Sequence, residues 1–217
     1  MKILLVAATV FEIAPFISAY RQKDNGMADR EIDILITGVG LTATTFHLQK
    51  QLMVKRPDLV IQAGITGCFD RSIALGTVVT VKKDAIADQG VLEAGEFQNL
   101  FQLGFTQPNQ FPYSKGWLVN GDTNLIKKTR LKPVTGISVN QITTSPKMIR
   151  TLVTQLNPVT ESMEGAALHY TCLQEKCSFL QLRSISNYVG ERNKARWNLK
   201  ESIINLNNEL IHLLKAL

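Results

Sequence analysis

The chain is short of the features that mark several large classes of protein. Its 217 residues include three cysteines, Cys68, Cys172 and Cys177, an odd number at no metal-ligand spacing. This usage is typical of a reduced cytosolic protein in which each thiol is a small core residue. No apolar run reaches the roughly 18 residues that a membrane-spanning helix needs. We therefore expect a cytoplasmic protein with no membrane partner.

Other absences narrow the chemistry. The sequence has no G-x-S-x-G elbow, no P-loop and no zinc-type spacing. His47, His169 and His212 form no constellation, so we expect no metal site and no cofactor. The apolar start, Met1 to Ala8, is short and is soon followed by Glu12, which favours a buried first strand over a signal peptide.

The net charge of +6 and the pI of about 9.3 leave a nucleic-acid partner open on composition alone. The lysines and arginines are mostly scattered, however, and no helix-turn-helix or RNA-recognition pattern is present. We expect solvated surface charge and no nucleic-acid partner. Attraction of an anionic small substrate is the main alternative.

What the chain does contain is an alternation of apolar runs with helical patterns. Its length suits one domain over residues 1–217, and runs rich in Val, Ile and Leu indicate a sheet buried on both faces. We predict an α/β fold, a single three-layer domain with a mixed, mostly parallel central sheet flanked by helices. The strands are predicted at Ile3–Ala8, Ile32–Thr37, Leu59–Ala63, Val78–Val81, Val134–Val139 and Phe179–Ile185. The helices are predicted at Phe11–Tyr20, Thr42–Lys55, Thr123–Thr129, Pro146–Leu156, Gly165–Glu175 and Asn198–Ala216. The long irregular segment Asp88–Lys115 is typical of a lid, a binding loop or an interface.

Ligands of open α/β sheets bind at the carboxyl ends of strands. Gly38-Val39-Gly40, Gly64-Ile65-Thr66-Gly67, Asn140-Gln141-Ile142 and Ser186-Asn187 all follow predicted strands, and Glu12 lies one turn beyond the first. Each also has an ordinary explanation. The glycines suit tight turns, Ser and Asn are common turn residues, and an acid is favoured in the first turn of a helix.

Ser162-Met163-Glu164-Gly165-Ala166-Ala167, at the start of a predicted helix, is the most informative stretch. A carboxylate can hold sugar hydroxyls, a methionine can pack on a ribose, and small residues let a ligand come close. A plain helix-initiating acid is the alternative. The amide of Asn187, about twenty residues later, could read the edge of a purine.

Taken together, these residues resemble the purine nucleoside phosphorylase and nucleosidase superfamily over nearly the whole chain. The specific part is Met163-Glu164-Gly165-Ala166; the glycine turns are less specific. The resemblance implies a nucleoside phosphorylase-like fold and cleavage of an N-glycosidic bond.

Within that superfamily the chain is more similar to hydrolases than to phosphorylases, because Gln62 stands where a phosphate-binding Arg is expected. Adenine-specific nucleosidases carry an Asp where this chain has Asn187. The segment Ser186–Trp197 looks like that of futalosine hydrolases, which release hypoxanthine from futalosine in menaquinone biosynthesis. An amide there suits a 6-oxopurine.

The resemblance also implies roles. Glu12 would activate water, Glu164 would hold the ribose, and Asn187 would stabilise the leaving base. The implied substrate-binding residues are Ile65, Thr66, Gly67, Ile142 and Met163, with Arg192 or Arg196 for a substrate carboxylate and Phe111 and Pro112 reaching a neighbouring subunit. We therefore expect a nucleoside and water as substrates and a homodimer or higher homo-oligomer. Open alternatives are a methylthioadenosine/S-adenosylhomocysteine nucleosidase, a purine nucleoside phosphorylase and a non-catalytic nucleoside-binding protein.

Overall fold

The computed structural model describes residues 1–22 and 31–217. Its strands are β1 (Lys2–Ala7), β2 (Glu31–Ile36), β3 (Leu59–Cys68), β4 (Val78–Asp84), β5 (Gly90–Glu93), β6 (Glu96–Asn99), β7 (Tyr113–Ser114), β8 (Trp117–Val119), β9 (Lys132–Ser138), β10 (Thr160–Ser162) and β11 (Phe179–Tyr188). Its helices are α1 (Val10–Arg21), α2 (Leu41–Val54), α3 (Thr123–Lys128), α4 (Pro146–Leu156), α5 (Gly165–Gln174) and α6 (Leu199–Ala216), with a short 3-10 turn at Lys194–Arg196.

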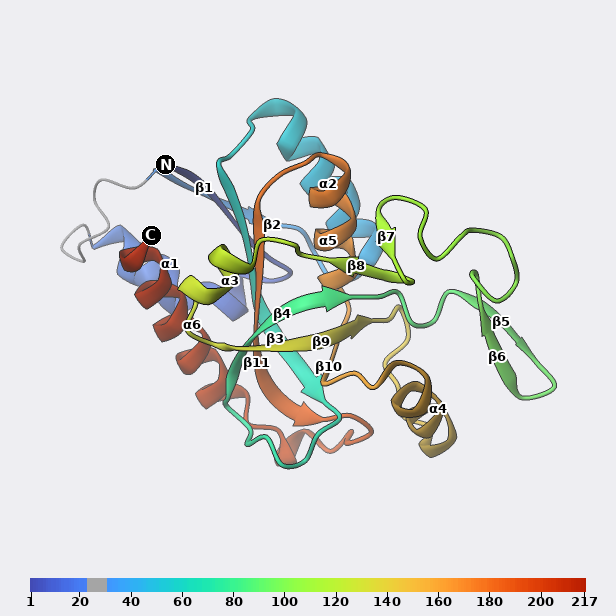
Figure 1. Ribbon diagram of the computed structural model, residues 1–217. Helices are drawn as coiled ribbons and strands as arrows, with labels where there is room; N and C mark the ends of the chain where they lie inside the picture. The colour runs from blue at the N-terminus through green and yellow to red at the C-terminus, as the bar shows by residue number, and fades with distance from the viewer. Residues whose placement is uncertain (23–30) are drawn as a thin grey trace.

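The central sheet is mixed and buried on both faces. β1 pairs in parallel with β2 and β3, and β3 also pairs in parallel with β11. Side chains of β1 alternate between two cores: Ile3 and Leu5 pack with α1 and α6, whereas Leu4 and Val6 pack with α2 and α5. Figure 1 shows α1 and α6 on one side of the sheet and α2 and α5 on the other, which confirms the three-layer α/β prediction.

Part of the sheet closes on itself. β11 pairs with both β3 and β4, β4 continues through β9 to β10, and β10 returns to β3 as an antiparallel neighbour. Five strands therefore form a ring, and β1 and β2 extend it as an open wing. The sequence analysis predicted strands at the positions of β3, β4, β9 and β11, but it missed β10, which has only three residues, and therefore did not predict this closure.

Two segments that the sequence analysis placed after the ends of strands lie inside strands. Gly64–Gly67 is the carboxyl half of β3, and Asn187 lies inside β11 next to a register shift. The prediction ended both strands too early, because it took glycine and Ser-Asn as turn signals. β3 and β11 continue because each is the other's hydrogen-bonding partner along nearly its whole length.

The segment 88–115 is also more regular than expected. It contains the hairpin β5–β6, which projects from the sheet in Figure 1, and the whole of the two-residue strand β7. Within residues 1–22 and 31–217, no helix has the length and hydropathy needed to cross a membrane.

Candidate active site

A cavity of about 260 Å³ opens beside the carboxyl ends of β1 and β10 and along the last residues of β3 and β11. It brings together nine of the twelve predicted site residues, Glu12, Ile65, Thr66, Gly67, Ile142, Met163, Glu164, Asn187 and Arg192. These residues come from segments that are far apart in the sequence. The convergence therefore depends on the fold, and it groups the residues as the resemblance implied.

Glu12 enters the cavity from the first turn of α1. Its Oε1 accepts a hydrogen bond from the backbone N–H of Ile65 at 3.0 Å, and its Oε2 accepts from the backbone N–H of Thr9 at 3.0 Å. The side chain is buried, and this burial raises the pKa of the carboxyl, while Arg183 acts against the rise. A carboxylate held in this way is poised to take a proton.

Glu164 reaches the cavity from the opposite side, as the residue that precedes α5. Its Oε1 accepts from the backbone N–H of Gly40 at 3.1 Å, and its Oε2 lies 3.6 Å from Arg183 Nη1. Gly40 has a φ of +101°, a conformation that favours glycine, so the turn after β2 can bring its N–H to the carboxylate.

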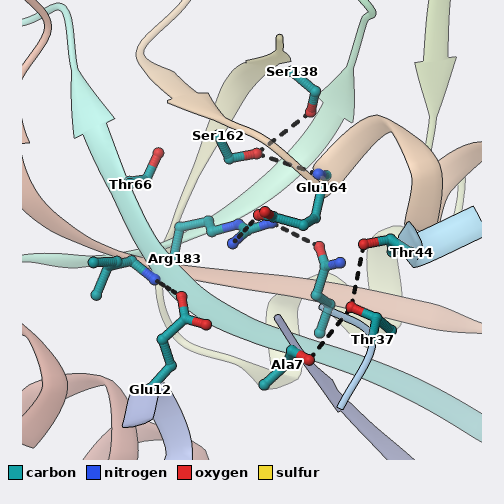
Figure 2. Close-up of polar contacts among 12 residues, drawn as sticks. Ala7, Glu12, Thr37, Thr44, Thr66, Ser138, Ser162, Glu164 and Arg183 are labelled. Carbon is teal, nitrogen blue, oxygen red and sulfur yellow. Dashed lines mark hydrogen bonds and ion pairs between the residues drawn. The ribbon is translucent and has the colours of Figure 1, made fainter. Parts of the chain in front are cut away.

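Arg183 is a central residue that the sequence analysis did not assign. It is 1% exposed, and its Nη2 donates to Gln62 Oε1 at 2.8 Å. Figure 2 shows Glu12 and Glu164 on either side of it. The signal for it was an arginine within the apolar run Phe179–Ile185, where a buried charge requires a partner.

Gly64 makes this arrangement possible. A Cβ added at this position would lie 2.8 Å from Glu12 Oε1 and would also clash with Arg183 Nη1. The glycine is therefore explained by the close approach of two charged side chains, and not by a turn.

A hydroxyl network fixes the start of α5. Ser162 Oγ accepts from the N–H of Gly165 at 3.2 Å, and Ser138 Oγ accepts from the N–H of Ala166 at 2.8 Å. The two hydroxyls lie 3.4 Å apart (Figure 2). Ser138 Oγ in turn donates to Asp84 Oδ1 at 3.0 Å. Because Glu164 immediately precedes this turn, the network holds its backbone in place.

Asn187 lines the same cavity from near the end of β11. Its Oδ1 accepts from Ser186 Oγ at 2.9 Å, and its Nδ2 donates to the Tyr188 carbonyl at 3.2 Å. Nδ2 also faces Gly67, where it would lie 3.5 Å from an added Cβ. An amide nitrogen has two N–H groups, so one remains for a ligand.

The two candidate arginines differ in position. Arg192 lines the cavity, and its guanidinium carbon lies 5.6 Å from the ring centre of Trp197, which also lines it. Arg196 is not part of the lining, and its Nη1 pairs with Glu191 Oε2 at 3.0 Å. The sequence analysis left open whether Arg192 or Arg196 would meet a substrate carboxylate. The structure places Arg192, and not Arg196, at the cavity.

Phe111 and Pro112 are not in the lining of this cavity. Phe111 is 61% exposed, whereas Pro112 is buried. Their expected role concerned the neighbouring subunit's site, and it stays a prediction. Among the described residues, no group of three or more His, Cys, Asp or Glu side chains has the arrangement of a metal site.

Comparisons with known proteins place the chain among nucleoside-cleaving enzymes of related sequence and fold. A futalosine hydrolase from Thermus thermophilus is 28% identical over 177 residues, which cover 78% of this chain and 75% of that protein. A 5'-methylthioadenosine/S-adenosylhomocysteine nucleosidase from Buchnera aphidicola is 22% identical over 215 residues, covering 95% and 88%. The native structure of futalosine hydrolase of Helicobacter pylori strain 26695 has the same fold, with a TM-score of 0.82, 17% identity and coverage of 100% of this chain and 98% of that one.

The family assignment comes from the sequence model of the phosphorylase superfamily, which matches residues 25–217. This stretch holds Glu164, Arg183 and Asn187 but begins after Glu12. The match covers most of the chain, and the chain therefore belongs to the phosphorylase superfamily.

Proposed function

We propose that this protein is a nucleosidase that hydrolyses the N-glycosidic bond of a 6-oxopurine nucleoside. Futalosine is the preferred candidate substrate and hypoxanthine the released base, which would place the reaction in menaquinone biosynthesis. The observation that carries the proposal is the approach of two buried carboxylates, Glu12 and Glu164, to the buried Arg183 at one cavity. The futalosine hydrolase relatives support the choice of substrate.

Glu12 acts as the general base. A water oxygen attacks the anomeric carbon, its proton passes to Glu12, and the electron pair of the glycosidic bond leaves with the purine. The Thr9 N–H and hydroxyl both donate to Oε2 of Glu12, and the Ile65 N–H donates to Oε1. These donors fix the carboxylate and leave one lone pair of Oε1 for the water. Burial raises the pKa of Glu12, which makes it a stronger base than an exposed glutamate.

Glu164 holds the ribose hydroxyls and favours the positive charge that develops on the sugar. Its interactions with the Gly40 N–H and Arg183 keep it in one orientation. Met163, which lines the same cavity, packs against the sugar. These roles follow from side-chain chemistry and from their position beside Glu12.

Asn187 stabilises the departing base. Its Oδ1 is occupied by the Ser186 hydroxyl, so the amide offers an N–H to the ligand. A 6-oxopurine presents acceptors at its keto oxygen and its imidazole nitrogen, and it can leave with its negative charge spread onto the keto oxygen. Asn187 cannot protonate the base, so solvent would supply that proton after cleavage.

Arg192 would bind a carboxylate on the substrate tail, as the carboxylated aryl group of futalosine provides. Arg192 and the Trp197 ring both line the cavity, so an aryl acid could contact the ring and the guanidinium together. Arg196 already has Glu191 as its partner, which makes it the weaker candidate.

Water is the proposed nucleophile in place of phosphate. Gln62 is 1% exposed, and it accepts from Arg183, which also faces Glu164. Arg183 is thus engaged by two side chains instead of being free to clamp an anion. A phosphorylase would need phosphate for turnover, which makes this alternative easy to test.

A second candidate is adenine release by a methylthioadenosine/S-adenosylhomocysteine nucleosidase. The Buchnera relative favours it, since that match covers more of this chain than the futalosine hydrolase match from Thermus does. Asn187 argues against it, because an amide cannot protonate a leaving adenine.

We also propose a homodimer. α2 exposes Phe46, Met53 and Val54, and the last two are each 78% exposed. Phe46 and Met53 line a hollow between α2 and residues 86–90, so the apolar surface is continuous with a groove. We propose that a second copy of the chain covers this face. Sedimentation at micromolar concentration tests this, and a monodisperse monomer contradicts it. The cytoplasmic location stays a prediction.

One experiment tests the reaction. The protein is incubated with futalosine, inosine and methylthioadenosine, each with and without phosphate, and the released base is identified by chromatography. We expect phosphate-independent release of hypoxanthine, fastest from futalosine. Release of adenine alone supports the second candidate, and phosphate-dependent release supports a phosphorylase. Tight binding without turnover indicates a nucleoside-binding protein.

A further inference from the structure

Glu161 is a buried carboxylate with no role in the proposed chemistry. It lies in the middle of β10, is 7% exposed, and belongs to the lining of the same cavity. The sequence analysis passed over it in favour of Met163 and Glu164, two and three residues later. Successive side chains of a strand point to opposite faces, so Glu161 and the next residue, Ser162, face different sides of β10. Ser162 contacts the start of α5.

The two carboxylate oxygens of Glu161 are in different situations. Oε1 accepts from the backbone N–H of Thr143 at 3.0 Å. Oε2 is closed off from solvent and has no hydrogen-bond partner among the described residues. A buried carboxylate oxygen without a donor is unfavourable, because it has lost its hydration and gained nothing in exchange.

The surroundings disfavour the charged form of Glu161. Burial raises the pKa of Glu161, nearby Asp88 raises it further, and Thr143 is the group that favours the charged form. A ligand N–H would supply the missing donor.

The position of Glu161 in the cavity indicates which part of a ligand could donate this hydrogen bond. Thr143, which holds its Oε1, directly follows Ile142 of the cavity lining. The backbone of Glu161 pairs with that of Gly67, and Gly67 is the residue that the Nδ2 of Asn187 faces. Glu161 therefore lies at the end of the cavity that Asn187 and Ile142 define, which is the base end in the proposed function.

Building on that proposed function, we propose that Glu161 is a specificity-determining residue that reads the leaving base. Its Oε2 accepts a hydrogen bond from a ring N–H of the purine, the N1–H that a 6-oxopurine has and adenine lacks. Asn187 donates and Glu161 accepts, so the two side chains match a keto oxygen and its neighbouring N–H. Adenine would place the lone pair of its N1 against the carboxylate, which is repulsive.

The test measures binding of free bases, so that it does not depend on turnover. Hypoxanthine, 1-methylhypoxanthine and adenine are titrated calorimetrically into the wild-type protein and into Glu161→Gln. Wild type should bind hypoxanthine roughly 10- to 100-fold more tightly than either other base, as expected for a hydrogen bond to a charged group. Equal affinities, or no binding of any base, overturn the proposal.

Glu161→Gln separates hydrogen bonding from the bulk of the methyl group. Its carbonyl can keep the Thr143 contact, and its NH₂ group then faces the base as a donor. Hypoxanthine should therefore lose its advantage over 1-methylhypoxanthine, and adenine should gain. An unchanged ratio means that the methyl group acts through size alone and overturns the assignment. Glu209→Gln, a partly exposed acid of α6 outside the lining, is the matched control and should keep the wild-type order.

Folding is checked by thermal melting. If Glu161→Gln does not fold, Glu161→Met takes its place; it is similar in length and removes the buried charge, and it too should lose the preference for hypoxanthine. Failure of the proposed function would look different: the wild type would bind hypoxanthine in this manner but cleave none of the nucleosides.

Discussion

Arg183 Nη1 lies 3.6 Å from Glu164 Oε2, and both side chains are almost completely buried. Two carboxylates, Glu12 and Glu164, approach this single guanidinium: Glu164 raises the pKa of Glu12, while Arg183 opposes the rise. One buried guanidinium thus acts on both carboxylates of the cavity.

Replacing Glu12 by Gln tests the general base. The amide keeps the size of the side chain but cannot take a proton, so turnover should fall by about 10²- to 10⁴-fold. Substrate binding should be close to wild type, as measured by calorimetry beside steady-state kinetics. Near-normal turnover would remove Glu12 from the mechanism.

The pH dependence of kcat/KM should reveal the same group. Glu12 must be unprotonated to act, and burial raises its pKa above the ordinary value of 4.5. Activity should therefore fall as the pH drops through this raised pKa, which places the acid limb above that of an exposed glutamate. The profile of Glu12→Gln should lack this limb; if the limb persists unchanged, it belongs to another group.

Asn187→Asp tests the choice of base. An acid at this position could protonate a leaving adenine, and as a carboxylate it would repel the keto oxygen of hypoxanthine. Cleavage of hypoxanthine nucleosides should fall, and cleavage of adenine nucleosides should rise relative to it. Competition between inosine and methylthioadenosine in one reaction measures the shift, and an unchanged ratio means that the base is read elsewhere.

Gly64→Ala should damage the site more than its small size suggests. The new Cβ would lie 2.8 Å from Glu12 Oε1 and would meet Arg183, so one of these charged side chains must move. We expect a loss of activity of at least about 10²-fold, because small misplacements of reacting groups have large effects on rate. Alanine at Gly121, where an added Cβ meets no atom within 4 Å, is the matched control. Equal activity of the two variants would contradict the packing argument.

Asp84 should make stability depend on pH. Complete burial raises the pKa of its carboxyl from 3.8 to about 6, so the folded state binds this proton more tightly than the unfolded state. The resulting contribution is fully present below the unfolded value and is lost as the pH rises through about 6. Asp84→Asn removes this titration, so the difference in urea stability between about pH 4 and about pH 8 should shrink, by up to roughly 3 kcal/mol. An identical pH dependence in both proteins would show that Asp84 does not titrate in this range.

Much of the fold was predictable because its signals are local. The apolar runs of β1, β2 and β11 and the helical periodicity of α2, α4 and α6 predicted those elements to within a few residues. Predictions failed where long-range pairing overrides local preference. Gly64–Gly67 and Asn187 have turn-forming residues but lie in strands, because β3 and β11 hydrogen-bond to each other along their length.

The sequence alone supplied the chemical groups of the candidate site: Glu12, Met163-Glu164 and the amide of Asn187. They stood out as a set through the resemblance to the nucleoside phosphorylase and nucleosidase superfamily, since each residue by itself also has an ordinary explanation. The tertiary structure decided how those groups are arranged. Closure of the β3–β11–β4–β9–β10 ring buries Arg183 beside two carboxylates and places Glu161 in the lining of the cavity. Several of the contacts that build the cavity join residues more than a hundred positions apart, such as Gly40 with Glu164 and Gln62 with Arg183, and local sequence preferences do not contain them.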